Sequence, residues 1–331
     1  MNFLLTYFNH ILNLLASNPF YIYGILVAAI IFTIITKGIQ FRYFFDGWKL
    51  MFRKNDDKEG VSSFRTAMLS IAGRVGTGNV AGVAVAVIMG GAGAVFWMWV
   101  VAILGMATSF IESTLGQYHK EKNSEHVYVG GPSYYIEQES KGKLKWIAII
   151  YSVVMIVSKG LFVLSIQAST IFNSTYEAFA IDRYSFWGIA IVGVILILVI
   201  YAILGGMTKL MQILSIIVPA MTLGYLCLVL IVMAMNIDFI PIYFKLVLTQ
   251  AFKPIAIFGG GIGVAISSGV KRGIFSNEAG QGTGAIAGAS GGGKHPVEQG
   301  LVQMITVFVD TIVVCSLSSF VIILPFFTIS I

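Results

Sequence analysis

The chain has 331 residues, of which 57% are hydrophobic and only 11% carry a charge. Because soluble domains usually contain about 25% charged residues, this composition excludes an ordinary soluble domain and indicates a chain embedded in a bilayer. The net charge of +6 does not indicate nucleic-acid binding, since the basic residues lie between apolar stretches and not on one polar domain. The two cysteines, Cys227 and Cys315, lie far apart in apolar stretches and predict no disulfide framework.

The first segment, residues 1–18, contains no lysine or arginine and so lacks the basic start of a cleaved signal peptide. Its polar side chains fall on one helical face, with leucine and phenylalanine opposite, which predicts a short helix lying in the membrane interface. His10 belongs to this polar face and is interpreted as solvated rather than as a ligand.

Eight apolar runs follow, and each is long enough to cross about 30 Å of hydrocarbon, which takes about 20 helical residues. Such segments must satisfy their own backbone hydrogen bonds, so they are helices or the strands of a closed barrel. The run FWGIAIVGVILILVIYAIL lacks the alternation of a barrel strand. The predicted fold class is therefore an all-α polytopic membrane protein with about eight transmembrane helices. The predicted spans are 20–36, 67–89, 95–117, 146–172, 186–206, 210–235, 254–270 with an irregular continuation to 288, and 298–324.

The connections between these runs predict the orientation of the chain. The first, third, fifth and seventh connections contain sixteen lysines and arginines, Lys271 and Arg272 among them, whereas the others contain three. Cytoplasmic loops of membrane proteins carry such an excess of basic residues. We therefore expect a multi-pass protein of the cell (inner) membrane with its N-terminus outside.

The second run opens with GRVGTGNVAG, residues 73–82, where a membrane helix would ordinarily be uninterrupted. Gly76, Gly78 and Ala81 fit a dinucleotide fingerprint, but no strand precedes them and an apolar helix follows. We interpret the run as a broken helix, whose freed amides suit an anionic group and whose oxygens suit a sodium ion. The alternative is close helix packing through small residues such as Gly78 and Gly82.

Charged residues at membrane depth cost several kcal/mol each unless they are paired or hydrated. They are Arg74, Glu112, Lys159 and Asp310. Arg74 and Glu112 are interpreted as lying near the cytoplasmic boundary, where a structural salt bridge is an alternative to function. Lys159 lies deeper, and it either pairs with Asp310 or stands where a cation would otherwise bind. Gln167, two turns later, is a candidate to meet an ammonium group or to form an interhelical hydrogen bond.

A second glycine-rich interruption, GGGIGVAISSGVKRGIFSNEAGQGTG at 259–284, opens the seventh run. Paired broken helices in corresponding positions indicate a transporter with inverted repeats and a binding site near the bilayer midplane. The interruptions are five spans apart, and this odd offset predicts two halves that insert in opposite directions. A passive channel fits paired breaks less well than a carrier does.

Soluble enzyme chemistry is not indicated. GASGGGKH at 288–295 lacks the preceding strand of a phosphate-binding P-loop and has His295 in place of its serine or threonine. No histidine or cysteine cluster has metal-ligand spacing, and no nucleophile is visibly arranged with a base. We therefore expect neither an enzyme nor an organic cofactor.

Five motifs resemble those of the alanine or glycine:cation symporter family. They are GRVGTGNVAGVAVAV, GAVFWMWVVAILGMATSFIESTLGQ, GGPSYYIE, VKRGIFSNEAGQGTG and HPVEQGLVQ. The resemblance implies a leucine-transporter-like fold, with one extra N-terminal helix (20–36) before two inverted five-helix repeats. Residues 1–331 would form one transporter domain, with a first repeat at 67–235 and an incomplete second repeat at 254–331. Three family helices would be missing, so a C-terminal truncation is expected.

The resemblance also implies sodium-coupled symport of alanine or glycine, with a proton as the coupling ion in some members. The residues implied to meet the substrate carboxylate and the cation are Gly76, Thr77, Gly78 and Asn79, with Gly76, Thr77 and Asn79 for the cation. Gln167 would face the substrate amine. The residues that would close the other side are Ser268, Gly269, Phe275 and Asn277. The alternative is a truncated, transport-inactive relative that binds amino acid, or a decayed product.

Overall fold

A computed structural model describes residues 19–53, 60–124, 127–182, 185–253 and 263–328. The interfacial helix predicted for 1–18, with His10, and the first part of the predicted span 254–270 lie outside these residues. The described part is mostly helical, with one short antiparallel pair of strands, β1 (Glu121–Lys122) and β2 (Tyr128–Val129).

The N-terminal third of the described chain forms a series of helices that ends in a bent helix pair and one long helix. Its helices are α2 (Pro19–Ile35), α3 (Ile39–Arg42), α4 (Phe44–Phe52), α5 (Ser63–Arg74), the π-helical η1 (Gly78–Gly82), α6 (Val83–Gly90) and α7 (Gly93–Tyr118). Ser62 caps α5, because its hydroxyl accepts a hydrogen bond from the Arg65 amide. The helices before and after the first glycine-rich run are bent by 58°, which confirms the predicted interruption.

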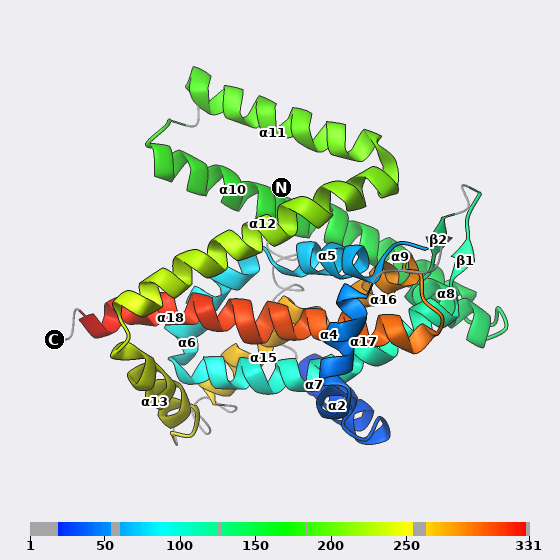
Figure 1. Ribbon diagram of the computed structural model, residues 1–331, viewed down its shortest axis with the longest axis horizontal. Coiled ribbons are helices and arrows are strands. Elements are labelled where there is room, and N and C mark those ends of the chain that lie inside the picture. Colours follow the sequence, from blue (N-terminus) through cyan, green and yellow to red (C-terminus); the bar gives the residue numbers. More distant parts are fainter. Residues whose placement is uncertain (1–18, 54–59, 125–126, 183–184, 254–262, 329–331) are drawn as a thin grey trace, which may run out of the picture.

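The middle of the chain contains one short polar helix and then a series of apolar helices. They are α8 (Pro132–Glu139), α9 (Lys145–Val157), the π-helical η2 (Ser158–Val163), α10 (Leu164–Phe179), α11 (Phe186–Leu204), α12 (Gly206–Met235) and α13 (Phe239–Ala251). Figure 1 shows α10 and α11 as a hairpin that stands away from the rest of the molecule. Helix α13 lies outside the predicted spans.

The C-terminal part begins with the second interrupted run. Its elements are α15 (Val264–Asn277), α16 (Thr283–Ala289), α17 (Pro296–Val307), the π-helical η4 (Phe308–Val314) and α18 (Cys315–Thr328). Helix α17 starts with Pro296 in its first turn, where an amide hydrogen would have no helical partner. Within the predicted second interruption at 259–284, α15 is continuous from Val264 to Asn277 and a gap separates it from α16, while the start of the interruption lies outside the described residues.

The helices give a multi-pass membrane protein of the all-α class. Among the described residues, five helices are long and apolar enough to cross a bilayer, or six if the bent α5–α6 pair counts as one span. Two shorter apolar helices are Tyr23–Ile35 and Phe239–Ala251. The eight-helix count and the inverted repeats remain predictions.

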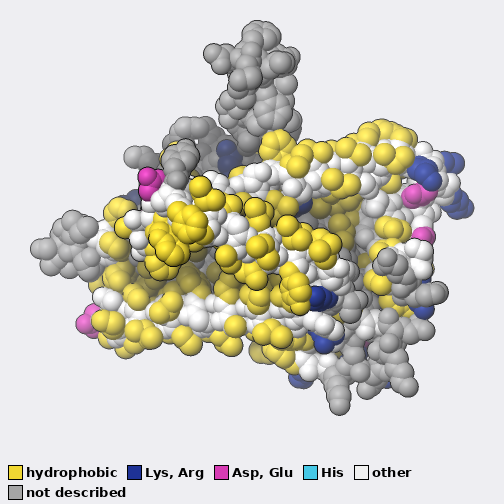
Figure 2. Space-filling view, turned by 90° about the horizontal axis from the view of Figure 1, so that it is seen from above, with side chains coloured by type: hydrophobic (Ala, Val, Ile, Leu, Met, Phe, Trp, Pro, Cys, Tyr) yellow, Lys and Arg dark blue, Asp and Glu magenta, His cyan; other side chains and the backbone are white. Residues whose placement is uncertain are grey.

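The core surrounds α7, which packs against α15, α16 and α17. One buried cluster joins α4, α5, α7 and α17 around Met51 and Ile305. A second joins α6, α7, α13 and α18 around Val95 and Phe320. In contrast, Figure 2 shows an outer face covered largely by hydrophobic side chains, with charged ones towards its edges. This arrangement places the two interrupted runs inside the packed part of the molecule.

Candidate functional site

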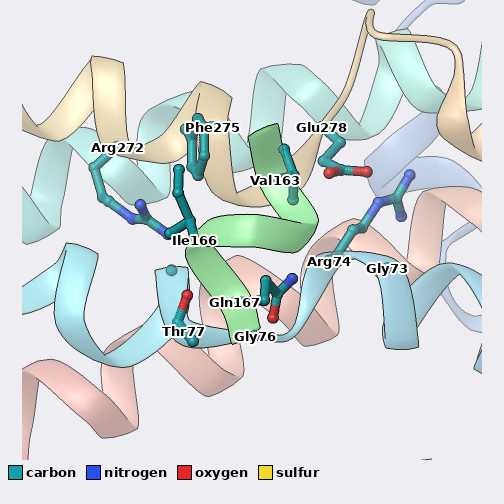
Figure 3. Close-up of a pocket in the computed structure, with 11 residues that line it drawn as sticks. Gly73, Arg74, Gly76, Thr77, Val163, Ile166, Gln167, Arg272, Phe275 and Glu278 are labelled. Carbon is teal, nitrogen blue, oxygen red and sulfur yellow. The ribbon is translucent and has the colours of Figure 1, made fainter. Parts of the chain in front are cut away.

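A partly open pocket, whose empty space of about 410 Å³ includes the space outside its mouth, lies between the two interruptions and the η2–α10 segment (Figure 3). Its lining residues are Gly73, Arg74, Gly76, Thr77, Gly78, Val163, Ile166, Gln167, Arg272, Phe275 and Glu278. Five of the residues predicted for a substrate site are therefore brought together here: Gly76, Thr77, Gly78, Gln167 and Phe275.

The first interruption exposes backbone next to this pocket. Helix α5 ends when the Val75 amide donates to the Ile71 carbonyl, and η1 starts only at Gly78. Between them, the Asn79 amide donates to the Gly76 carbonyl over 3.0 Å, and the Gly76 amide donates to Asn79 Oδ1 over 3.4 Å. Asn79 thus holds both polar groups of Gly76: its side-chain oxygen accepts from the Gly76 amide, and its backbone amide donates to the Gly76 carbonyl.

An arginine side chain occupies the space beside Gly78 and Gly82, the glycines of the close-packing alternative. A Cβ atom added to Gly78 or to Gly82 would collide with the guanidinium of Arg272. The two glycines therefore permit a close approach, but the approaching group is an arginine side chain and not the small residues of another helix.

The second interruption is held by a buried carboxylate. Glu112, on α7, accepts hydrogen bonds at Oε2 from the amides of Gly280 (3.0 Å) and Gly282 (3.1 Å). Both glycines have a φ of +86°, and Glu278 has a φ of +52°, in the left-handed region that glycine adopts most readily. Glu112 thus positions the loop that carries Glu278 to the pocket.

Arg74 and Glu112 make separate sets of hydrogen bonds. Arg74 donates to Ser109 Oγ (3.3 Å), to the Gln303 carbonyl (3.4 Å) and to Thr306 Oγ1. Both charged groups approach Gly284, where an added Cβ would lie 2.8 Å from Arg74 Nη2 and 3.2 Å from Glu112 Oε1. The two residues are buried in the helical core, and they connect α5, α7, α16 and α17.

Lys159 pairs with Glu278 and not with Asp310, which was one of the two hypotheses for this lysine. Its ammonium group, on η2, forms an ion pair with Glu278, and the side chains are 27% and 9% exposed, respectively. The pairing with Asp310 is wrong, because η2 faces the end of α15 whereas Asp310 lies on η4 among other partners. The Lys159–Glu278 pair instead ties η2 to the second interruption.

Asp310 is fully buried and, among the described residues, its carboxylate accepts hydrogen bonds from neutral side chains, while the charge of Arg74 also acts on it. Asn79 Nδ2 donates to its Oδ1 over 2.6 Å, while Ser276 Oγ (2.8 Å) and Thr311 Oγ1 (2.7 Å) donate to its Oδ2. Cys315 Sγ lies 3.5 Å from Asn79 Nδ2. This cluster joins η1, α15 and η4, and its carboxylate, hydroxyl and amide oxygens are hard ligands of the kind that small hard cations prefer.

Gln167 reaches the first interruption from α10. An added Cβ on Gly76 would lie 2.7 Å from Gln167 Oε1 and 3.0 Å from its Nε2. Figure 3 shows this amide between the Thr77 side of the pocket and the Arg74 side. The side chain is therefore available to a molecule in the pocket, in addition to contacting a second helix.

Three predicted residues of the seventh run point elsewhere in the described structure. Gly269 packs on Ala94 of α7, and Ser268 packs on Gly90 at the end of α6. Asn277 is buried, and its Oδ1 accepts a hydrogen bond from the Ala279 amide over 3.0 Å. These residues fix α15 against α6 and α7 and shape the loop after it.

Arg272 lines the pocket, although the predicted seventh span ends at residue 270 and leaves Arg272 in the connection after it. Helix α15 continues past Arg272 to Asn277, and the guanidinium lies 5.1 Å from the centre of the Phe275 ring. An arginine three residues before Phe275 shares a helical face with it, so extending the helix to Asn277 would have revealed the position. Glu278, Ser276 and Thr311 were likewise missed as members of the site.

Comparison with known proteins gives a consistent match. The sodium:alanine symporter family matches residues 1–328. The chain is 42% identical to a putative sodium/proton-dependent alanine carrier protein, YrbD, of Bacillus subtilis, over 91% of this chain and 60% of that protein. It is 38% identical to the amino-acid carrier protein AlsT of the same species, over 96% of this chain and 67% of that protein.

A third relative is the sodium/proton-dependent alanine carrier protein of Bacillus sp. (strain PS3), which is 35% identical over 83% of this chain and 60% of its own length. The chain thus spans about three fifths to two thirds of the length of these relatives.

Proposed function

This chain belongs to the sodium:alanine symporter family, a family of transporters and not of enzymes, and from that membership we propose that it carries alanine or glycine across the cell membrane together with sodium. The observation that supports this proposal most directly is the link between the pocket and the buried Asp310 carboxylate. Asn79 makes that link, because its amide contacts both Gly76 and Asp310.

The proposed cation site is the cluster around Asp310. A buried carboxylate surrounded by neutral donors is costly unless a cation or proton joins it. Sodium would take oxygens from Asp310, Asn79, Ser276 and Thr311. Of the positions that the resemblance implied for the cation, Asn79 touches this carboxylate, while Gly76 and Thr77 line the substrate pocket.

Coupling follows from the two contacts of Asn79. Its Oδ1 accepts from the Gly76 amide and its Nδ2 donates to Asp310. A cation at Asp310 attracts the amide oxygen and repels the amide hydrogens, so Asn79 would turn and release the Gly76 amide for a substrate carboxylate. Sodium and amino acid would then each strengthen the binding of the other, as thermodynamic linkage requires.

The family membership also supports a topology. We propose two inverted repeats, with the first at 67–235, the second beginning at 254, and residues 20–36 as an additional helix, in about eight spans. The proposal is supported by the 58° bend at the first interruption and by the separation of α15 from α16, which would be the paired breaks of such repeats. The N-terminus would lie outside and the basic connections in the cytoplasm of the cell (inner) membrane.

Uptake into proteoliposomes tests the function. Purified protein is reconstituted, and labelled alanine uptake is measured with an inward sodium gradient, with an inward proton gradient, and with neither. We expect accumulation with the sodium gradient alone. Accumulation with the proton gradient alone would mean that the coupling ion is a proton and not sodium. Uptake that does not depend on either gradient would contradict coupling. Binding of alanine without uptake would support the alternative of a transport-inactive relative.

A further inference from the structure

Arg272 lies at one end of the pocket, opposite the Arg74 and Glu278 end. Figure 3 shows its side chain descending from α15 towards Ile166 and η1, while Gln167 lies between the two ends. The arginine is held in place by packing: its guanidinium lies beside the Phe275 ring and over Gly78 and Gly82.

The glycines of η1 form a cradle for this guanidinium. Gly78 and Gly82 are four residues apart and so lie on the same side of the segment. A Cβ atom at Gly78 would meet Arg272 Nη2, and one at Gly82 would meet Nη1 and Cζ. Any other residue at either position would push the arginine away from the start of the second half-helix.

Within the part of the chain that the structure describes, the guanidinium forms no ion pair with a carboxylate, although the charge of Asp310 acts on it. Its Nε and Nη2 atoms are buried and have no hydrogen-bond partner there. Unpaired donors on a desolvated cation are costly, and a planar guanidinium matches a carboxylate with two parallel hydrogen bonds. The cation also stands next to Gly78, at the interruption whose amides would face the same negative group.

We propose that Arg272 binds the carboxylate of the transported amino acid. This inference rests on the proposed function and assigns the orientation of the substrate. The carboxylate lies between Arg272 and the amides of the first interruption, and the ammonium group points towards Gln167 Oε1 and Glu278. The side chain lies against Val163, Ile166 and Phe275, whose bulk favours a small substrate.

A binding comparison between alanine and alaninamide tests this assignment. Alaninamide keeps the ammonium group but replaces the carboxylate with a neutral amide. Affinities for both are measured on the full chain in detergent micelles, for the wild type, Arg272→Gln, Arg272→Lys and the exposed neighbour Lys271→Met. Thermal unfolding of each variant reports folding separately.

Arg272→Gln is expected to weaken alanine binding about tenfold to hundredfold, the usual loss for a hydrogen-bonded charge, while alaninamide affinity changes by less than about threefold. The preference for alanine over alaninamide therefore falls. Arg272→Lys keeps the charge but loses the planar guanidinium, so its preference for alanine is expected to lie between those of the wild type and Arg272→Gln. Lys271→Met keeps the wild-type preference.

If Arg272→Gln prefers alanine over alaninamide as strongly as the wild type does, the inference is overturned. This holds even if the variant has a lower melting temperature. If Arg272→Gln does not fold, the preference of Arg272→Lys decides in the same way. A wild-type chain that binds no alanine would instead overturn the proposed function.

Discussion

Two parts of the protein differ in how much apolar surface they bury. In the packed part (63–118 and 264–328), the most apolar stretch of α7 is 61% buried, and that of α17–α18 is 50% buried. In the exposed part (145–235), the corresponding stretches of α9–α10 and α11 are each 6% buried. Apolar side chains that face lipid lose nothing by remaining outside the protein, so both parts are compatible with a bilayer.

The difference shows where the chemistry of the site is built. The buried charges Arg74, Glu112 and Asp310 all lie in the packed part, where neighbouring helices supply their hydrogen bonds. The exposed part contributes Lys159 and Gln167, both from the short stretch where η2 and α10 approach the interruptions. The same part also contacts the second interruption through α9, because the Tyr151 hydroxyl donates to the Gln281 carbonyl over 2.9 Å.

The largest expected effect is on the free energy of unfolding, when one methyl group is added in the packed part and, for comparison, in the exposed part. In Gly116→Ala the new Cβ would lie 2.6 Å from the Ala285 carbonyl oxygen, whereas at Gly193 nothing lies within 4 Å. We expect Gly116→Ala to lower the free energy of unfolding by about 3 kcal/mol, because backbone must move. Gly193→Ala should change it by less than about 1 kcal/mol, on the stabilising side. Denaturant unfolding in micelles measures both, and equal effects would contradict the packing difference.

A charge change comes next. Asp310→Asn keeps the shape of the buried side chain but removes its charge, so sodium-driven alanine uptake should fall about tenfold to hundredfold, as expected for loss of a charged ligand. Asp182→Asn, in the exposed loop before α11, makes the same change outside the site and should leave uptake unaltered. Uptake that is equally sodium-dependent in Asp310→Asn would remove Asp310 from the cation site.

The smallest effect concerns the contact between the two parts. Lys159→Met leaves Glu278 without its partner, and we expect a loss of about 1 kcal/mol in unfolding free energy, because Lys159 is partly exposed. The double variant Lys159→Met with Glu278→Gln should recover most of this loss, while Lys143→Met, on the surface, should cost nothing measurable. A double variant less stable than Lys159→Met alone would show that the ion pair does not join the two parts.

The interruptions could be predicted from the sequence because their cause is local. Glycine is the residue that interrupts a helix most readily, and glycine-rich runs in otherwise apolar segments are visible without a structure. Gly76, Thr77 and Gly78 reach the pocket for this reason, whereas Gln167 could be proposed because it is a polar side chain in an apolar run. Helix α13 was missed, since Pro241 and Lys245 interrupt the apolar run from which it is built.

The charge partners could not be predicted, because they depend on how the helices turn. Helical periodicity assumes 3.6 residues per turn, and the π-helical segments depart from it. Lys159 lies in η2 and Asp310 in η4, so the direction of neither side chain follows from its position in an α-helix. Arg272 was misplaced for a different reason, since the apolar run ends near residue 270 although the helix continues to Asn277.

The π-helical segments have a consequence for how this sequence can vary in length. Asn79, Lys159 and Asp310 each lie in one of them. Removing a single residue from a helix turns everything beyond it by about 100° and draws it back about 1.5 Å. A π-helical turn holds about one residue more than an α-helical turn, so a deletion inside it can be absorbed by a return to α-helical hydrogen bonding. Loss of Gly160, for example, would leave Gln167 close to its present phase, whereas the same loss in an α-helical stretch would turn the residues beyond it. The π-helical segments are therefore the places where this chain can lose one codon without turning the helix that follows, a difference between positions that no hydropathy profile would register.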